Sequence, residues 1–160
     1  MLLIRPARVD DTHTLWTLIR EFAEYERELD LVVISEADLR RDGFGPDPRF
    51  RALIAEWDGQ IAGYAVFFEI YSTWEGRAAL LLEDLFVREE FRGKGIGTAL
   101  LKQVARLAQD EGCFGLRWEV RDWNEAAVEL YKAMGGKFLS DRCSVLLVGA
   151  AFERLAGETS

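Results

Sequence analysis

A glycine-rich turn between an apolar strand and an amphipathic helix constrains this chain more than any other feature. Three glycines fall within five residues in the segment Arg92-Gly93-Lys94-Gly95-Ile96-Gly97. Glycines let a ligand come close to the backbone, and the N–H groups at the start of the following helix attract anions. Arg92 and Lys94 would add positive charge. The turn therefore predicts a phosphate-binding site, and tight packing alone is the alternative.

The residues on either side of the turn predict the elements that hold it. Residues 78–87 are nearly continuous in apolar side chains, as in a central strand covered on both faces. From Gly97 to about Asp110 apolar residues recur at helical spacing. A dinucleotide fingerprint normally opens a βαβ unit, whereas this turn lies mid-chain after an apparently antiparallel run. We therefore disfavour a dinucleotide-binding protein.

Short strands and helices alternate along the rest of the chain. Strands are predicted at residues 3–7, 50–57, 60–70 and 113–120. Asp58-Gly59 indicates a hairpin between two of them, since both turn positions favour positive φ. A last hairpin is expected from residues 137–140 and 144–148, followed by a frayed tail.

Three further helices are predicted from their capping residues. They would begin after Asp10 or Asp11, after Ser35 and after Asn124. The first would run to about residue 28, and Gly135-Gly136 would end the third. The order of elements predicts an α+β fold, with a mostly antiparallel central sheet flanked by helices. We expect one domain over residues 1–160.

Composition excludes several classes of partner. The chain has 20 basic residues in no stripe and a formal net charge of −8, so a nucleic-acid partner is not expected. A cationic small molecule would be attracted, although acidity often serves solubility alone. One histidine and two well-separated cysteines predict neither a metal site nor a disulfide. Without a long apolar stretch, we expect a cytoplasmic protein with no membrane partner.

Two carboxylates interrupt the strand before the turn. Glu83 and Asp84 are neighbours, so regular alternation would point them to opposite faces of the sheet. Desolvation on such a strand raises a carboxyl pKa toward the range where the group accepts a proton near neutral pH. We favour Glu83 as the catalytic base. For Asp84, the alternatives to a catalytic role are an ion pair with an arginine such as Arg117, the strand end or a dimer contact.

Other polar residues have structural as well as functional explanations. Tyr131 lies on the apolar face of the last predicted helix, and a buried phenol can serve as an acid, although most inward tyrosines belong to the core. Asn124 is most simply a helix cap. The carboxylates between Glu21 and Asp30, with Trp74 and Glu75 elsewhere, could bind a cation or form a solvated acidic face.

Taken together, these motifs resemble a known family. The segments Leu82-Glu83-Asp84-Leu85-Phe86-Val87, Phe91 to Gly97, Trp123-Asn124-Glu125 and Leu130-Tyr131-Lys132 look like the GNAT superfamily of N-acetyltransferases. Within it the chain most resembles the diamine acetyltransferases, the spermidine/spermine N-acetyltransferase group, with their thialysine-acetylating relatives. Ile4 to Ala7, Tyr25-Glu26 and Asp42 to Gly45 also match, so the likeness covers most of the chain.

The resemblance implies a role for each matching residue. Tyr131 would protonate the departing thiolate, and Glu83 would assist deprotonation of the amine. Acetyl-coenzyme A, as the co-substrate, would contact Leu85, Phe86, Val87, Arg92, Gly93, Lys94, Gly95, Ile96, Gly97, Thr98, Asn124, Glu125, Ala126 and Ala127. The amine would contact Tyr25, Glu26, Glu83, Arg117, Trp118 and Glu119. No metal is implied.

The resemblance also implies the reaction. Such enzymes transfer the acetyl group by direct attack of the amine on the thioester and commonly form homodimers. The expected acceptor is a small primary amine, a polyamine or diamine. The alternatives are a lysine- or thialysine-like amino acid, or a non-catalytic acyl-coenzyme A binding module. Asp141-Arg142-Cys143-Ser144 replaces an acidic segment of the polyamine enzymes, which argues against a polycation.

Overall fold

A computed structural model describes residues 1–157 of the chain. The backbone divides into two compact units, one from Met1 to Glu119 and the other from Val120 onward. The first holds β1 (Leu2–Pro6), α1 (Thr12–Tyr25), α2 (Glu36–Phe44), β2 (Arg51–Trp57), β3 (Gln60–Ser72), β4 (Arg77–Val87), α3 (Ile96–Asp110) and β5 (Leu116–Trp118). The second holds α4 (Glu125–Ala133) and α5 (Gly149–Ala156). Three 3-10 turns lie at Val9–Asp11, Leu29–Leu31 and Glu89–Phe91.

The first unit is built on a five-stranded sheet in the order β1-β2-β3-β4-β5. The first four strands pair antiparallel, and β5 pairs parallel to β4. This confirms the predicted α+β fold with a mostly antiparallel sheet. The strand predicted over residues 113–120 is shorter than expected, since only Leu116–Trp118 pairs with β4.

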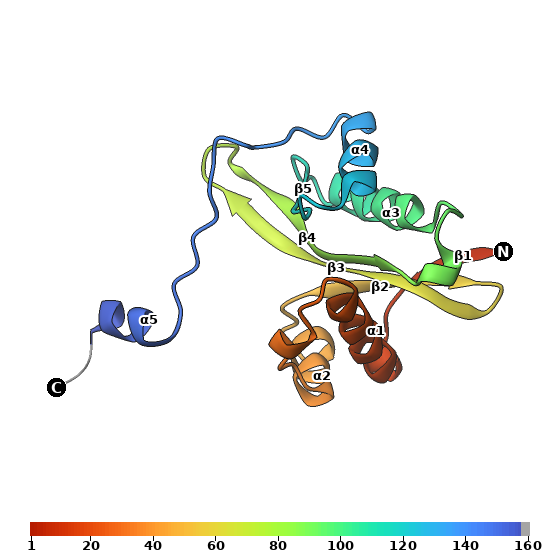
Figure 1. Ribbon diagram of the computed structural model, residues 1–160, viewed down its shortest axis with the longest axis horizontal. Coiled ribbons are helices and arrows are strands. Elements are labelled where there is room, and N and C mark those ends of the chain that lie inside the picture. Colours follow the sequence, from red (N-terminus) through yellow and green to blue (C-terminus); the bar gives the residue numbers. More distant parts are fainter. Residues whose placement is uncertain (158–160) are drawn as a thin grey trace. The chain divides into compact units, whose positions relative to one another are not determined.

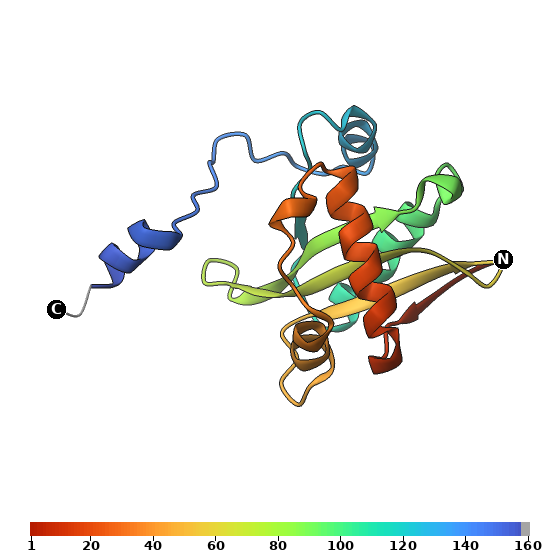
Figure 2. The same cartoon turned by 60° about the horizontal axis from the view of Figure 1, so that its bottom comes forward.

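Helices cover both faces of this sheet. Figure 1 shows α1 and α2 on one face and α3 on the other, and Figure 2 shows α1 running across its face of the sheet. Leu15 and Leu18 of α1 are fully buried, as are Leu100 and Val104 of α3. The central strands are therefore covered on both sides, as their continuous apolar runs predicted.

Local signals in the first unit behave as the sequence predicted. Asp58 and Gly59 both have positive φ, 50° and 78°, in the turn between β2 and β3. The Ser35 hydroxyl accepts from the Asp38 N–H, and the Asp38 carboxylate accepts from the Ser35 N–H.

The helix predicted to reach residue 28 ends at Tyr25, because Arg27 adopts a left-handed φ of 62° that no helix can continue. Within residues 1–157, no helix is both long and apolar enough to cross a membrane.

The predicted last hairpin is wrong. Residues 137–148 form no strand in the structure, and α5 occupies part of the expected tail. A hairpin needs an apolar face to cover or a sheet edge to join, and the described part of the second unit contains no strand. Apolar content alone therefore misidentified residues 144–148.

Candidate active site

The glycine turn presents free backbone donors at the start of α3. Gly93 and Gly95 have φ values of 75° and 77°, in the left-handed region that glycine adopts without strain. A Cβ atom at either position would meet nothing within 4 Å, so both glycines border open space. Gly95 is the N-cap of α3, no side chain of the described residues caps the helix, and its first turn carries no acidic residue. The arrangement fits an anionic phosphate group.

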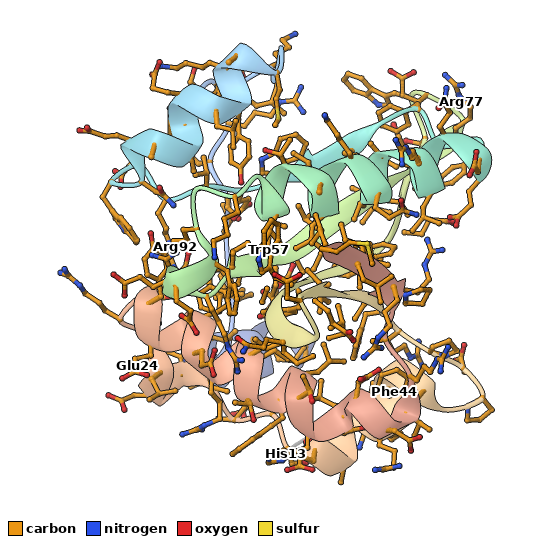
Figure 3. All side chains as sticks on the ribbon, turned by 90° about the vertical axis from the view of Figure 1, so that its right-hand side faces the viewer. His13, Glu24, Phe44, Trp57, Arg77 and Arg92 are labelled. Carbon is orange, nitrogen blue, oxygen red and sulfur yellow. The ribbon has the colours of Figure 1, made fainter. Side chains whose placement is uncertain are left out.

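The two basic residues of the turn point to aromatic rings. The Arg92 guanidinium lies 4.4 Å from the centre of the Tyr25 ring, and its Nε donates to the Val87 carbonyl at 3.0 Å. The Lys94 ammonium lies 5.3 Å from the Trp57 ring. Figure 3 shows Arg92 at the same side of the molecule as Glu24, near the end of α1. The turn therefore combines backbone N–H groups with two cationic side chains.

A β-bulge lies at Glu83. Val66 of β3 pairs with Asp84, and the next residue, Phe67, pairs with Leu82, so Glu83 stands opposite no residue of β3. A bulge interrupts the strict alternation on which the opposite-face expectation for Glu83 and Asp84 rested. Glu83 is exposed, whereas Asp84 is partly buried. Their environments differ, as the sequence predicted, although their charges lie close enough to interact.

Asp84 has the property that the sequence argument assigned to Glu83. The Tyr64 hydroxyl donates to Asp84 Oδ2 at 3.0 Å. Burial raises the pKa of Asp84 from its usual value to about 6, the Tyr64 bond lowers it, and the charges of Glu83 and Glu26 raise it. A carboxylate with this pKa is ionised at neutral pH and can still accept a proton there. Its partner is a tyrosine and not Arg117.

An open pocket of about 420 Å³ lies between the end of α1 and the residues that follow β4. Its lining combines four acidic side chains with two aromatic and two basic ones: Glu21, Glu24, Glu89, Glu90, Tyr25, Phe86, Arg88 and Arg92. Arg88 is held by a bidentate ion pair with Glu21, both N···O distances being 2.7 Å. The Phe86 ring lies 6.3 Å from the Tyr25 ring. The pocket can therefore hold a small molecule that carries positive charge.

The structure brings the other predicted amine-site residues of the first unit near Glu83. In the parallel β4–β5 pair, Arg117 stands beside Leu81 and Trp118 beside Leu82, the residue before Glu83. Glu119 follows the end of β5 and is exposed. Glu26 caps the C-terminus of α1, and its charge acts on Asp84. Residues from α1 and β5 thus lie beside the stretch of β4 from Leu81 to Asp84.

The second unit carries the remaining predicted residues. Asn124 caps α4, its side chain accepting from the Ala127 N–H at 3.3 Å, so the structural explanation of Asn124 is confirmed. Glu125 and Ala126 form the first turn of α4. Burial raises the pKa of Tyr131 above its ordinary value, which keeps the phenol protonated. A proton donor with this property suits the role that the resemblance implies for Tyr131.

Sequence reasoning missed two groups. Tyr64 was assigned to a strand without a polar role, and the Arg88–Glu21 pair was not foreseen. A signal existed for Tyr64, because a tyrosine in a run as apolar as residues 61–68 must find a partner for its hydroxyl. No comparable signal joins Arg88 to Glu21, since they lie 67 residues apart.

Known proteins resemble this chain in sequence and in fold. The chain is 43% identical to the thialysine N-epsilon-acetyltransferase of Sus scrofa, over 98% of both chains. It is 36% identical to the spermidine/spermine N(1)-acetyltransferase-like protein 1 of Homo sapiens, over 86% of this chain and 21% of that one. An integron cassette protein from V. cholerae has the same fold, with a TM-score of 0.81 over 98% of both chains at 23% identity.

A family model gives the assignment. The acetyltransferase (GNAT) family matches residues 12–135, a range that includes strands β2 to β5, the glycine turn and Tyr131. With acetyltransferases among its relatives, the chain is an enzyme and not merely a binding module. This chain belongs to the GNAT family of acetyltransferases.

Proposed function

We propose that this enzyme uses acetyl-coenzyme A to acetylate the side-chain amine of a small, lysine-like amino acid. The observation that carries the proposal is the mixture of charges in the pocket at the end of α1. Its carboxylates suit an ammonium group, and Arg92 suits a carboxylate. An amino acid of this kind has both groups, whereas a polyamine has only the first.

Arg92 is the residue that separates these two substrate classes. Among residues 1–157, the structure pairs its guanidinium with no carboxylate, while the neighbouring Arg88 is already neutralised by Glu21. Stacking on Tyr25 and the Nε bond to the Val87 carbonyl hold the guanidinium in place and leave its two terminal nitrogens available. A fixed cation would repel a polycation and attract an amino-acid carboxylate. The thialysine-acetylating relatives support the same choice.

A polyamine or diamine remains the second candidate, and it was the first expectation from the sequence. Four glutamates line the pocket, and the protein from Homo sapiens named as spermidine/spermine acetyltransferase-like is among the relatives. Four carboxylates beside two arginines leave a net negative lining, which would also attract a diamine. The choice between the candidates is therefore a question of whether Arg92 contributes to binding.

The chemistry needs a proton acceptor on the amine side. An alkylammonium is protonated at pH 7, so it must lose a proton before or during attack. We assign this step to Glu83 and Asp84 together, because exposed Glu83 can meet the incoming amine and Asp84 has a pKa of about 6. Tyr131 would give a proton to the departing thiolate. Neither step requires a covalent intermediate on the enzyme.

The fit of acetyl-coenzyme A rests on the glycine turn. When bound, acetyl-coenzyme A supplies the activated carbonyl that the amine attacks. The N–H groups between Gly93 and Thr98 would hold its pyrophosphate, and the backbone of Leu85 to Val87 would lie along its pantetheine arm. Asn124 to Ala127 would complete the contact. The family match crosses both compact units, which supports one catalytic domain.

A matched pair of amines tests the proposal. Lysine and cadaverine differ only by the carboxylate, so a comparison of their acetylation rates measures what the carboxylate contributes to binding. The rates are monitored through the free thiol of the coenzyme A that is released. We expect lysine or thialysine to have the lower KM. In Arg92→Gln the KM for lysine should rise roughly 10-fold, equivalent to a lost charged hydrogen bond, and that for cadaverine should not.

The control is Arg20→Gln, which removes a similar arginine–aromatic contact, 4.8 Å from the Trp16 ring, elsewhere on α1. A rise in the KM for acetyl-coenzyme A with both amines would assign Arg92 to the cofactor instead. Silence of the enzyme with lysine, thialysine, cadaverine and spermidine alike would refute the small-amine proposal. A homodimer and a cytoplasmic location remain predictions, and sedimentation equilibrium would measure the first.

A further inference from the structure

Tyr64 is a fully buried phenol in the centre of the sheet. Its side chain has no exposed surface and is one of the largest fully buried side chains among the described residues. A phenylalanine would fill the same space without a polar atom. The hydroxyl has a hydrogen-bond partner, since it donates to Asp84 Oδ2 at 3.0 Å. The core of the sheet therefore contains a polar group aimed at the proposed amine site.

The Tyr64 ring is held rigidly from both sides. On β2 its paired residue is Ile54, which is also fully buried, and on β4 its paired residue is Phe86. The Phe86 ring meets it edge-on, with centroids 6.4 Å apart. The Asp84 carboxylate, by contrast, sits next to the bulge at Glu83, where the ladder is disrupted. A fixed donor thus holds a carboxylate on an irregular part of the strand.

We propose that Tyr64 is a positioning residue for amine acetylation, whose hydroxyl orients Asp84 and keeps it ionised to receive the proton of the amine. This inference rests on the proposed function. Tyr64 touches neither substrate nor acetyl group in this scheme. It acts only through Asp84, so removal of its hydroxyl should change the protonation of Asp84 more than the shape of the site.

The negative charges around Asp84 oppose its ionisation, and the Tyr64 hydrogen bond offsets part of that effect. On its own strand Asp84 is beside Glu83, and from α1 it faces Glu26, both of which raise its pKa along with burial. Glu21, also on α1, acts on Tyr64 but is paired with Arg88. The Tyr64 hydroxyl is what lowers the pKa of Asp84 toward about 6. Because burial raises the pKa of Tyr64 itself, the phenol stays a donor as the pH changes.

Tyr64→Phe is the direct test, since it keeps the ring and deletes only the hydroxyl. The loss of one hydrogen bond to a charged group should raise the pKa of Asp84 by about one unit. The acid limb of kcat/KM for the amine should therefore move up by about one pH unit. Activity near pH 8.5 should stay within roughly 2-fold of the parent enzyme, because Asp84 is ionised there in both proteins.

Tyr71→Phe provides the matched control, since Tyr71 is an exposed tyrosine of β3. It should leave the pH profile unchanged. A Tyr64→Phe enzyme that loses the same fraction of activity at every pH would show a merely structural role and overturn the inference. In an Asp84→Asn background, Tyr64→Phe should cause no further shift of the acid limb.

Direct titration of Asp84 separates this inference from the proposed function. Carboxyl-carbon NMR of the full chain, assigned through Asp84→Asn, should give a midpoint about one unit higher in Tyr64→Phe. An unchanged midpoint in an active enzyme would overturn the role of Tyr64 alone. A shifted midpoint in a protein that acetylates no amine would overturn the proposed function, and with it the role of Tyr64 in it.

Discussion

The turn from Arg92 to Gly97 takes its shape from the backbone of one short segment, whereas the pocket at the end of α1 is assembled from side chains of distant segments. In the turn, two glycines with φ near 75° and an uncapped helix start create the proposed anion site. In the pocket, Tyr25 and Phe86 meet across 61 positions of sequence. The contrast suggests that a common cofactor is bound by backbone and a variable acceptor by side chains.

The largest effect should come from blocking the turn. Gly95→Asp places a carboxylate at the N-cap of α3, where it can take the helix N–H groups for itself and repel phosphate. The φ of 77° at Gly95 makes the substitution strained, but aspartate is among the residues that tolerate positive φ, so the fold should survive at a modest cost. We expect coenzyme A affinity, measured by calorimetry, to fall at least roughly 100-fold, since a like-charge contact costs several kcal/mol.

Gly59→Asp is the matched control for this change. Gly59 has a φ of 78° and, like Gly95, has nothing within 4 Å of a built Cβ, so the strain and the added charge are the same. It lies in the turn between β2 and β3. Equal loss of coenzyme A affinity in both variants would mean that net charge, and not the turn, controls binding.

The carboxylates on β4 should affect catalysis without affecting the cofactor. Asp84→Asn removes the group whose pKa is about 6, and we expect kcat/KM for the amine to fall roughly 100-fold, as is usual for loss of a general base. Glu83→Gln should lower kcat/KM for the amine less than Asp84→Asn does, if Asp84 is the group that receives the proton of the amine. Steady-state rates at saturating acetyl-coenzyme A measure both. A full-rate Asp84→Asn enzyme would return the base role to Glu83 alone.

The same substitution should stabilise the folded protein. The pKa of Asp84 is raised on folding, so the folded state binds the extra proton, and stability is lost as the pH rises from about 4 to about 6. Asp84→Asn should therefore gain up to about 3 kcal/mol at pH 7, and almost nothing at pH 4. Urea unfolding at the two pH values checks this. A gain that does not depend on pH would exclude titration of Asp84 as its cause.

Features formed by neighbouring residues could be predicted from the sequence, whereas features formed by distant residues could not. Capping at Ser35, the Asp58-Gly59 turn and the glycine turn are each formed by residues within a few positions, so their patterns were sufficient. The bulge at Glu83 depends on how β4 aligns with β3, and the Tyr64–Asp84 bond joins residues 20 positions apart. The wrong hairpin at residues 137–148 has the same origin, because a strand requires a partner that composition does not supply.

Hydrogen exchange of the full chain tests the division between turn and pocket most directly. With coenzyme A alone, protection should rise at the backbone N–H groups of residues 96–98 and stay constant at residues 24–26. Adding lysine should then protect residues 24–26 and the stretch around Asp84. Protection of residues 24–26 by coenzyme A alone, with none at the turn, would contradict the account.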